Sequence, residues 1–141
     1  MASVEWICGV NPIVVPAEEG AGQSYKAGDL VKWSSGQLVI ATAGAIDGIA
    51  RRDASGTQHA VCEVELINLD SVYSARYHTD ATDIALCGDI ADFTFTAGGH
   101  TLEESGADTD TVIVALDPRD AEGTASGRLY IKFLAGATLQ A

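Results

Sequence analysis

The sequence predicts an all-β fold, mainly antiparallel, in the form of a small barrel or sandwich. Apolar and polar residues alternate over short stretches, as they do in half-buried strands. Fifteen glycines in 141 residues, with a 47 % hydrophobic fraction carried mainly by Ala, Val, Ile and Leu, favour short strands and tight turns over long helices. A chain of this length suits a single domain.

From residue 25 onward, short apolar stretches are separated by turn residues. Leu30 to Trp33 and Gln37 to Thr42 flank the turn Ser34-Ser35-Gly36, and we expect them to form a hairpin. Further strands are expected within residues 46–51, 59–69, 71–77, 92–96, 100–102, 111–116 and 128–134. Eight or more strands at this spacing are typical of a barrel or sandwich.

Two of these segments, and residues 79–88, carry more specific expectations. Thr111 to Leu116 is almost continuously apolar, which predicts a strand buried on both faces. In the last strand, Leu129, Ile131 and Phe133 are expected to face inward. Residues 79–88 have two interpretations, a short helix or a further strand, and the pattern does not separate them.

Residues 1–24 differ in composition from the rest of the chain and are predicted to form an extended N-terminal arm, with residues 25–141 as the single β-barrel or sandwich domain. Pro12 and Pro16 exclude a helix and allow pairing only as an edge strand or docking along a groove. The alternative is that Val4 to Cys8 is the first strand of the barrel. The predicted protein interface consists of the apolar side chains of the arm, Trp6, Ile7, Val10, Ile13, Val14 and Val15.

The charge excludes several classes of partner. Eight basic and twenty acidic side chains give a net charge of −12, which repels a nucleic-acid backbone. The basic residues are scattered, and only Arg51 and Arg52 are adjacent, so neither nucleic acid nor an anionic membrane surface is an expected partner. The longest uncharged run, residues 33–46, is too short and polar to cross a bilayer. No basic residue precedes Lys26, so synthesis in a cytoplasm is expected.

The residues that commonly bind metals do not have metal-site spacing. No C-x-x-C pair occurs, and the cysteines are expected to be small buried side chains with free thiols. The histidines are far apart in the sequence. We therefore expect neither a metal nor a cofactor. These residues are Cys8, Cys62, Cys87, His59, His78 and His100.

No pattern predicts catalysis. Residues 123–127 have the wrong spacing for a nucleophile elbow, and neither a P-loop nor a dinucleotide fingerprint occurs. His78, Asp80 and Asp83 are close in sequence, but they are interpreted as a turn whose carboxylates accept local backbone hydrogen bonds. The acidic residues of 103–110 are interpreted as a solvated loop. The sequence therefore predicts a protein that is not an enzyme.

Three stretches resemble tailed-bacteriophage capsid cement, or decoration, proteins: Tyr25 to Val31, Gly48 to Ala50 and Val112 to Asp120. The likeness spans about residues 25 to 134. It implies a small β-rich virion protein on the outer capsid surface that cements neighbouring major capsid protein subunits, often as a homotrimer. This is the function we expect.

The alternative function is a non-catalytic phage tail or fibre module, or a carbohydrate-binding β-module. A carbohydrate site needs exposed aromatic side chains, whereas the chain has only three Phe, four Tyr and two Trp, several of which the core must use.

Overall fold

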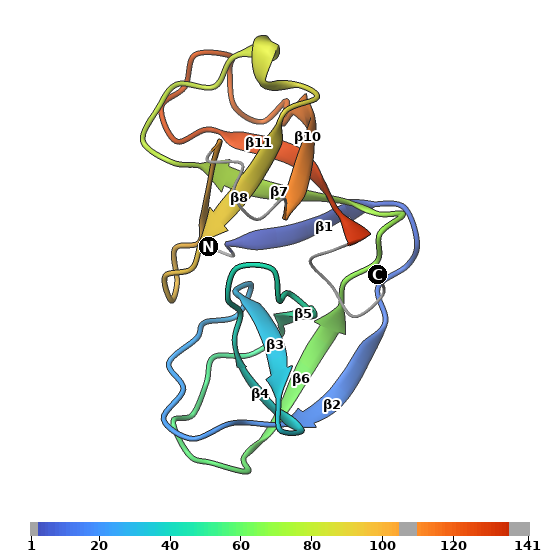
Figure 1. The fold of residues 1–141 in the computed structure, drawn as a ribbon, viewed down its shortest axis with the longest axis vertical. Helices are drawn as coiled ribbons and strands as arrows, with labels where there is room; N and C mark the ends of the chain where they lie inside the picture. The colour runs from blue at the N-terminus through green and yellow to red at the C-terminus, as the bar shows by residue number, and fades with distance from the viewer. Residues whose placement is uncertain (1–2, 105–109, 136–141) are drawn as a thin grey trace.

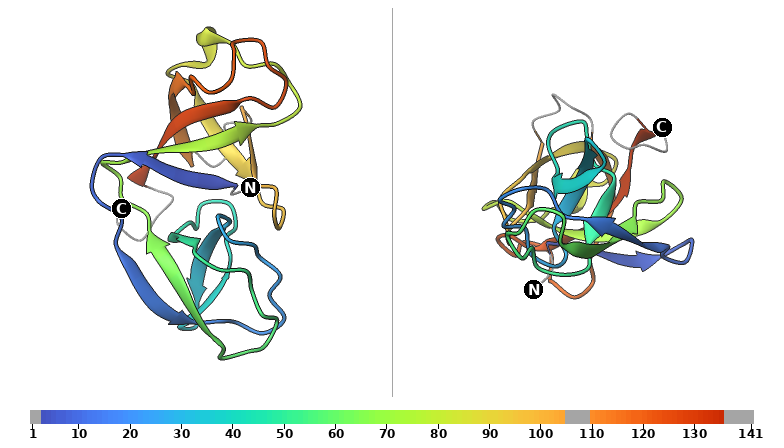
Figure 2. Two further views of the ribbon diagram at one scale, coloured as in Figure 1. Left: turned by 180° about the vertical axis from the view of Figure 1, so that it is seen from behind. Right: turned by 90° about the horizontal axis from the view of Figure 1, so that it is seen from below.

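The computed structural model describes residues 3–104 and 110–135 and shows two β lobes, one above the other (Figure 1). The upper lobe contains residues 4–8, 72–104 and 110–133, and the lower lobe contains residues 14–67. Figure 2 shows the same two lobes from behind and from below. Within the described residues the regular structure is eleven strands and one single-turn 3₁₀ helix, which confirms the predicted all-β fold.

The upper lobe is a closed five-stranded barrel with one added strand. Its strands are β1 (Val4–Cys8), β7 (Val72–Tyr77), β8 (Ile90–Thr94), β9 (Thr101–Glu103), β10 (Thr111–Leu116) and β11 (Arg128–Phe133). The order is β7-β11-β10-β8-β9, and a parallel pairing of β9 with β7 closes the barrel. β1 pairs antiparallel with the first part of β7 and has no second partner strand, so it is an added edge strand.

The lower lobe is a five-stranded antiparallel sheet. Its strands are β2 (Val14–Glu18), β3 (Leu30–Ser34), β4 (Gln37–Ile40), β5 (Gly48–Ala50) and β6 (Val61–Leu66). They follow the order β2-β6-β5-β3-β4. A bridge between Glu19 and Leu38 brings the end of β2 to β4, so the sheet curls almost into a second barrel.

The buried apolar residues form two hydrophobic clusters. The larger cluster lies between the lobes and joins lower-lobe residues such as Leu30, Ile46 and Ile67 to the barrel interior. Leu129, Ile131 and Phe133 belong to it, as predicted for the last strand. The smaller cluster lies inside the lower lobe and consists of Tyr25, Val31, Leu38, Ala50, Cys62 and Val64. Because the neighbours Leu30 and Val31 belong to different clusters, the first part of β3 is buried on both faces.

Asp29 forms a buried polar link between the lobes. Its Oδ1 accepts a hydrogen bond from Ser3 Oγ at 2.6 Å, and its Oδ2 accepts from Gly98 N at 2.7 Å and from Lys26 N at 2.9 Å. Asp29 is fully buried, so each of these bonds replaces one with water. The Gly28-Asp29 step therefore makes a turn and also joins three separate parts of the chain.

The predicted hairpin is confirmed as β3–β4, in which Ser34 pairs with Gln37. Ser35 and Gly36 both have positive φ, 50° and 80°, as in the two-residue turns that match strand twist. Residues 79–88 contain a single-turn 3₁₀ helix, Ile84–Leu86, which Asp83 caps by accepting a hydrogen bond from Ala85 N. Of the two interpretations, the short helix is therefore nearer to the structure than the strand, although this helix is of the 3₁₀ type and only three residues long.

The prediction that Thr111 to Leu116 is buried on both faces is wrong. Thr111 and Ile113 are buried, whereas Val114 is 40 % exposed. The physical reason is that β10 is a wall strand of a closed barrel, so only one of its faces is covered. Of the cysteines, Cys62 is buried as expected, but Cys8 is exposed and Cys87 is half-buried.

Candidate interaction surface

The six residues predicted as a protein interface lie along one continuous path that joins the lobes. Trp6 and Ile7 are in β1, Val14 and Val15 are in β2, and the connector between these strands carries the rest. The boundary predicted at residues 24 and 25 does not separate this segment from the body, because β1 pairs with β7 and β2 pairs with β6. The six residues are Trp6, Ile7, Val10, Ile13, Val14 and Val15.

Both ends of this path contribute to the fold. Val4 is 1 % exposed and belongs to the core between the lobes. Trp6 packs against the same core and donates from Nε1 to Val10 O at 3.0 Å. Val15 packs against the cluster inside the lower lobe. Val4 to Cys8 is therefore the first strand of the fold, as the alternative had it, but it is an edge strand added to the barrel and not one of the five strands that close it.

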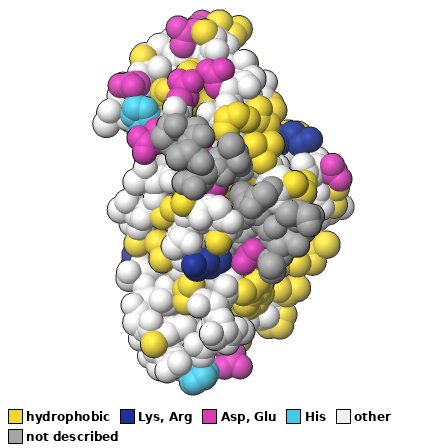
Figure 3. Space-filling view, viewed as in Figure 1, with side chains coloured by type: hydrophobic (Ala, Val, Ile, Leu, Met, Phe, Trp, Pro, Cys, Tyr) yellow, Lys and Arg dark blue, Asp and Glu magenta, His cyan; other side chains and the backbone are white. Residues whose placement is uncertain are grey.

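Three of the six residues are exposed and form what we call the connector ridge: Val10 is 42 % exposed, Ile13 56 % and Val14 40 %. Figure 3 shows hydrophobic side chains gathered on the right-hand side of the lower lobe, where β2 lies in Figure 1. Val10 and Ile13 line the same hollow, and neighbouring exposed aliphatic side chains are a feature of protein-binding surfaces. Binding of a partner at this ridge is a prediction.

The free edge of β2 is protected from pairing by Pro16. Ile13 O accepts from Leu66 N and Glu19 N donates to Ala60 O, so the odd-numbered residues face β6 and the even-numbered residues face outward. Pro16 stands at an outward position, where it removes a donor from the free edge. Such a proline discourages edge-to-edge aggregation. The connector ridge therefore offers side chains rather than a strand edge.

A cleft of about 700 Å³ lies between the lobes beside this path. One wall is β1, with Val4, Glu5 and Trp6, and the connector contributes Pro12. The lower lobe contributes residues 26–28, 49–51, Asp53 and Glu65, and the barrel contributes Gly98.

Glu65 is a buried charged residue in the lining of this cleft, and it is only 4 % exposed. Its Oε1 accepts from Arg51 Nη1 at 2.8 Å, whereas Oε2 is buried without a hydrogen-bond partner. Burial raises the pKa of the Glu65 carboxyl, and the charge and hydrogen bond of Arg51 oppose this rise. Glu65 was not among the residues predicted from the sequence, because a charged residue in an alternating strand is normally on the solvent face.

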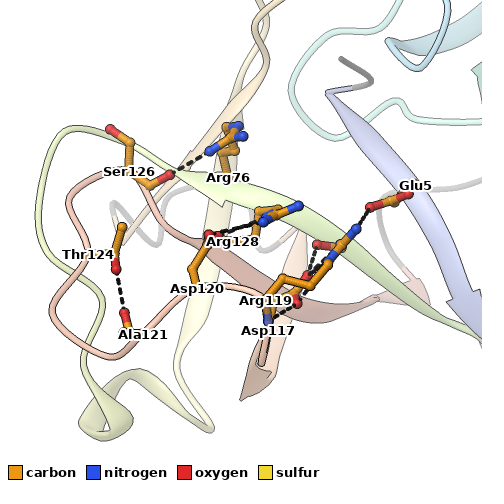
Figure 4. Close-up of polar contacts among 10 residues, drawn as sticks. Glu5, Arg76, Asp117, Arg119, Asp120, Ala121, Thr124, Ser126 and Arg128 are labelled. Carbon is orange, nitrogen blue, oxygen red and sulfur yellow. Dashed lines mark hydrogen bonds and ion pairs between the residues drawn. The ribbon is translucent and has the colours of Figure 1, made fainter.

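Arginine side chains gather on the outer face of β1, β7 and β11 (Figure 4). Arg119 contacts Glu5 Oε1 of β1 and also pairs with the buried carboxylate of Asp117. Arg128 pairs with Asp120 through Nε at 2.8 Å. Burial of Asp117 favours a raised pKa, but hydrogen bonds from Arg119 and Ser74 outweigh it and lower the pKa to about 2. The stretch Asp117 to Asp120 is thus an internal brace of the barrel.

The groups considered for catalysis or metal binding do not assemble. His78 Nε2 lies 3.4 Å from Asp80 Oδ2, but Asp83 accepts from Ala85 N and caps the 3₁₀ turn. Asp108 lies outside the described residues, and Asp110 is buried and accepts from Gly44 N. In the part of the chain that the structure describes, no three His, Cys, Asp or Glu side chains are placed to hold a metal ion. In that same part, no helix has the length and apolar character needed to cross a membrane.

The aromatic side chains are mostly used by the fold. Five of the nine are buried, and the remaining four, Trp6, Trp33, Phe95 and Tyr130, are half-buried. Trp33 packs against the hydrophobic cluster inside the lower lobe. A flat exposed aromatic platform for a sugar ring is therefore not formed.

The fold resembles a phage head-fibre base. A crystal structure described as the head fiber gp8.5 N base in bacteriophage phi29 superposes with a TM-score of 0.52 at 16 % sequence identity. The match covers 92 % of this chain and 100 % of that chain. No protein-family model and no curated protein sequence matches this chain.

The likeness to the head-fibre base spans both lobes, since so much of the chain is covered. At this identity it shows a shared fold. The arrangement of a closed barrel on a curled five-stranded sheet is therefore not peculiar to this sequence.

Proposed function

We propose that this chain is a non-catalytic structural protein of a tailed-phage virion, bound to the outer surface of the head, where it cements neighbouring major capsid protein subunits. The observation that carries the proposal is the fold shared with the phi29 head-fibre base over 92 % of the chain. That neighbour belongs to a phage head, and the resemblance of residues 25–134 to capsid cement proteins leads to the same location.

The connector ridge supplies the contact to the head. Full burial of an aliphatic side chain contributes roughly 1.5–3 kcal/mol relative to exposure, and these side chains are already about half-covered. The ridge therefore contributes part of that amount per residue. Val10, Ile13 and Val14 lie on a segment that both lobes hold in place, so little conformational entropy is lost on docking.

We further propose that the chain is a homotrimer on the head, in keeping with the resemblance to cement proteins. A net charge of −12 per subunit opposes self-association at low salt. Sedimentation of the purified chain should therefore show association that increases with ionic strength. A strict monomer in solution, together with isolated single copies on particles, would contradict the trimer.

A second candidate function is the base of a head fibre. The same structural neighbour favours it, because that protein is itself described as a fibre base. The two functions differ in what projects from the head. Electron cryomicroscopy of particles would show density that continues outward from each copy for a fibre base, and closed knobs at subunit boundaries for a cement protein.

Purified particles test the location directly. Antibodies against the chain, detected by immunogold electron microscopy, should label heads, and quantitative mass spectrometry should find hundreds of copies per particle for a cement protein. Label confined to tails would refute the head location. Absence of the chain from purified particles would refute the virion role itself.

A further inference from the structure

The cleft between the lobes has a partly free strand edge along one wall, where β1 lies. Val4 N donates to Gly28 O at 3.0 Å, so this amide points away from β7 and toward the lower lobe. Groups two residues apart in a strand point in the same direction, so the N–H and C=O of Trp6 also face away from β7. Among the described residues neither group of Trp6 has a backbone partner on that side. Trp6 lines the cleft, so its unpaired backbone groups lie along it.

This edge differs from the free edge of β2. The outward positions of β2 include Pro16, which has no N–H, whereas β1 contains no proline. The cleft volume of about 700 Å³ lies within the range of ligand sites, roughly 300–1,000 Å³. A short extended polypeptide can therefore enter and add to β1, the recognition mode in which main-chain hydrogen bonds supply affinity.

Glu65 specifies what side chain such a segment should carry. Its Oε2 is buried and lacks a hydrogen-bond donor, and a buried carboxylate oxygen is most strongly satisfied by a cationic donor. Arg51 occupies only Oε1 and its side chain is half-exposed, so it can shift to admit a second cation. The cleft lining holds three carboxylates, Glu5, Asp53 and Glu65, against the two cations Lys26 and Arg51.

We propose that the cleft binds an extended segment of a partner protein that adds as a strand to the free edge of β1 and places a lysine or arginine side chain against Glu65. The net charge of −12 favours the approach of such a basic segment. The site is separate from the connector ridge and does not depend on the head location. It can be tested on the purified chain in solution.

The probe is a fluorescein-labelled, end-blocked heptapeptide of alternating Val and Thr with one central Lys, measured by fluorescence anisotropy with the full chain. Binding should weaken by about tenfold or more in Glu65→Gln, since a charge-assisted hydrogen bond is lost. Glu63→Gln is the matched control: Glu63 lies on the same strand, pairs with Arg52 and is outside the cleft lining. Its affinity should stay within about twofold of the parent.

Peptide variants keep the test independent of protein folding. Replacing the central Lys with Gln, or methylating the backbone nitrogens that face β1, should each abolish detectable binding. In ¹H–¹⁵N spectra the amide of Trp6 should shift on adding the Lys peptide. No binding of the Lys peptide at millimolar concentration, equal binding of a Glu-containing peptide, or shifts confined to residues outside the cleft would each overturn the proposal.

Discussion

Nε2 of His100 lies 3.9 Å from Oδ1 of Asp29, and both side chains are fully buried between the lobes. His100 Nδ1 accepts a hydrogen bond from Leu30 N at 3.3 Å. A ring nitrogen that accepts is unprotonated, so the neutral imidazole carries its proton on Nε2. Adding a proton to Nδ1 would break the bond to Leu30. His100 is thus held neutral at the joint of the two lobes.

The first prediction is that the protein loses stability below about pH 6.5. Burial lowers the pKa of His100 from its ordinary value of 6.5, and the nearby charge of Asp29 opposes this shift. Below pH 6.5 the unfolded chain therefore binds more protons at this residue than the folded chain does. Since stability decreases where the unfolded state binds more protons, the free energy of unfolding should decrease from pH 7.5 to pH 5.5. Urea unfolding measures it.

Two variants test whether His100 causes this pH dependence of the unfolding free energy. In His100→Gln the titrating group is gone, so the slope of unfolding free energy against pH should flatten, whatever the absolute stability. In His59→Gln the slope should persist, because His59 is an exposed residue that contacts Glu18. An unchanged slope in His100→Gln would show that another group is responsible.

The second prediction concerns the brace between β1 and the barrel. Arg119→Ala removes the partner of Glu5 and leaves the buried Asp117 with fewer donors (Figure 4). Hydrogen bonds to charged groups contribute about 1.5–3 kcal/mol each, so we expect a loss of about 2 kcal/mol in unfolding free energy. Arg52→Ala is the control, since its pair with Glu63 is exposed and should contribute under about 1 kcal/mol. Equal losses in both variants would contradict the brace.

Acid unfolding gives a third measurement on the same brace. The pKa of Asp117 is lowered from 3.8 to about 2. A carboxyl group whose pKa is lowered by folding stabilises the protein at a pH above its pKa in the unfolded state. This stabilisation is lost as the pH falls through its pKa in the folded state. The contribution is therefore lost between pH 3.8 and about pH 2. In Ser74→Ala, which removes one donor to Asp117, acid unfolding should begin at a higher pH; an unchanged midpoint would argue against this role of Ser74.

The fourth prediction is that Gly48→Ala destabilises the lower lobe. A Cβ atom at Gly48 would lie 2.7 Å from the carbonyl oxygen of Glu65 and 2.3 Å from Val64 Cγ2. Backbone cannot move aside cheaply, and overpacking typically costs about 1–3 kcal/mol. Gly99→Ala is the control, because no atom lies within 4 Å of its added methyl group. Thermal unfolding should show a lower melting temperature for Gly48→Ala alone.

Strand positions were predictable where a local pattern carries them. Alternation in residues 61–66 and 128–133 reflects one covered face, and Ser35-Gly36 is a turn that its residues favour. These signals are local, because side-chain direction alternates along any strand. The predicted and observed strands therefore agree along most of the chain.

What the sequence could not predict depends on long-range pairing. The parallel contact of Arg76 with Thr101 closes the barrel and exposes Val114, yet no local pattern encodes it. The same limit applies to the candidate site. The sequence shows that Ile13 is apolar, but it does not show that Glu65 lies beside β1, because that position depends on how the two lobes pack.

The last prediction separates anchoring from folding in the N-terminal segment. Deleting residues 2–20 would remove β1 and β2 together, so a failure of that variant to fold would say little about anchoring.

Point substitutions distinguish the two roles. Ile13→Ser on the connector ridge should leave the melting temperature nearly unchanged, because Ile13 is more than half exposed, and should weaken binding to phage heads by about tenfold as apolar contact is lost. Val4→Ala, in the core between the lobes, should lower the unfolding free energy by about 1–3 kcal/mol while the remaining folded protein binds heads normally. Calorimetry and co-sedimentation with heads measure the two effects. If Ile13→Ser binds heads as well as the parent protein, the ridge is not the anchor.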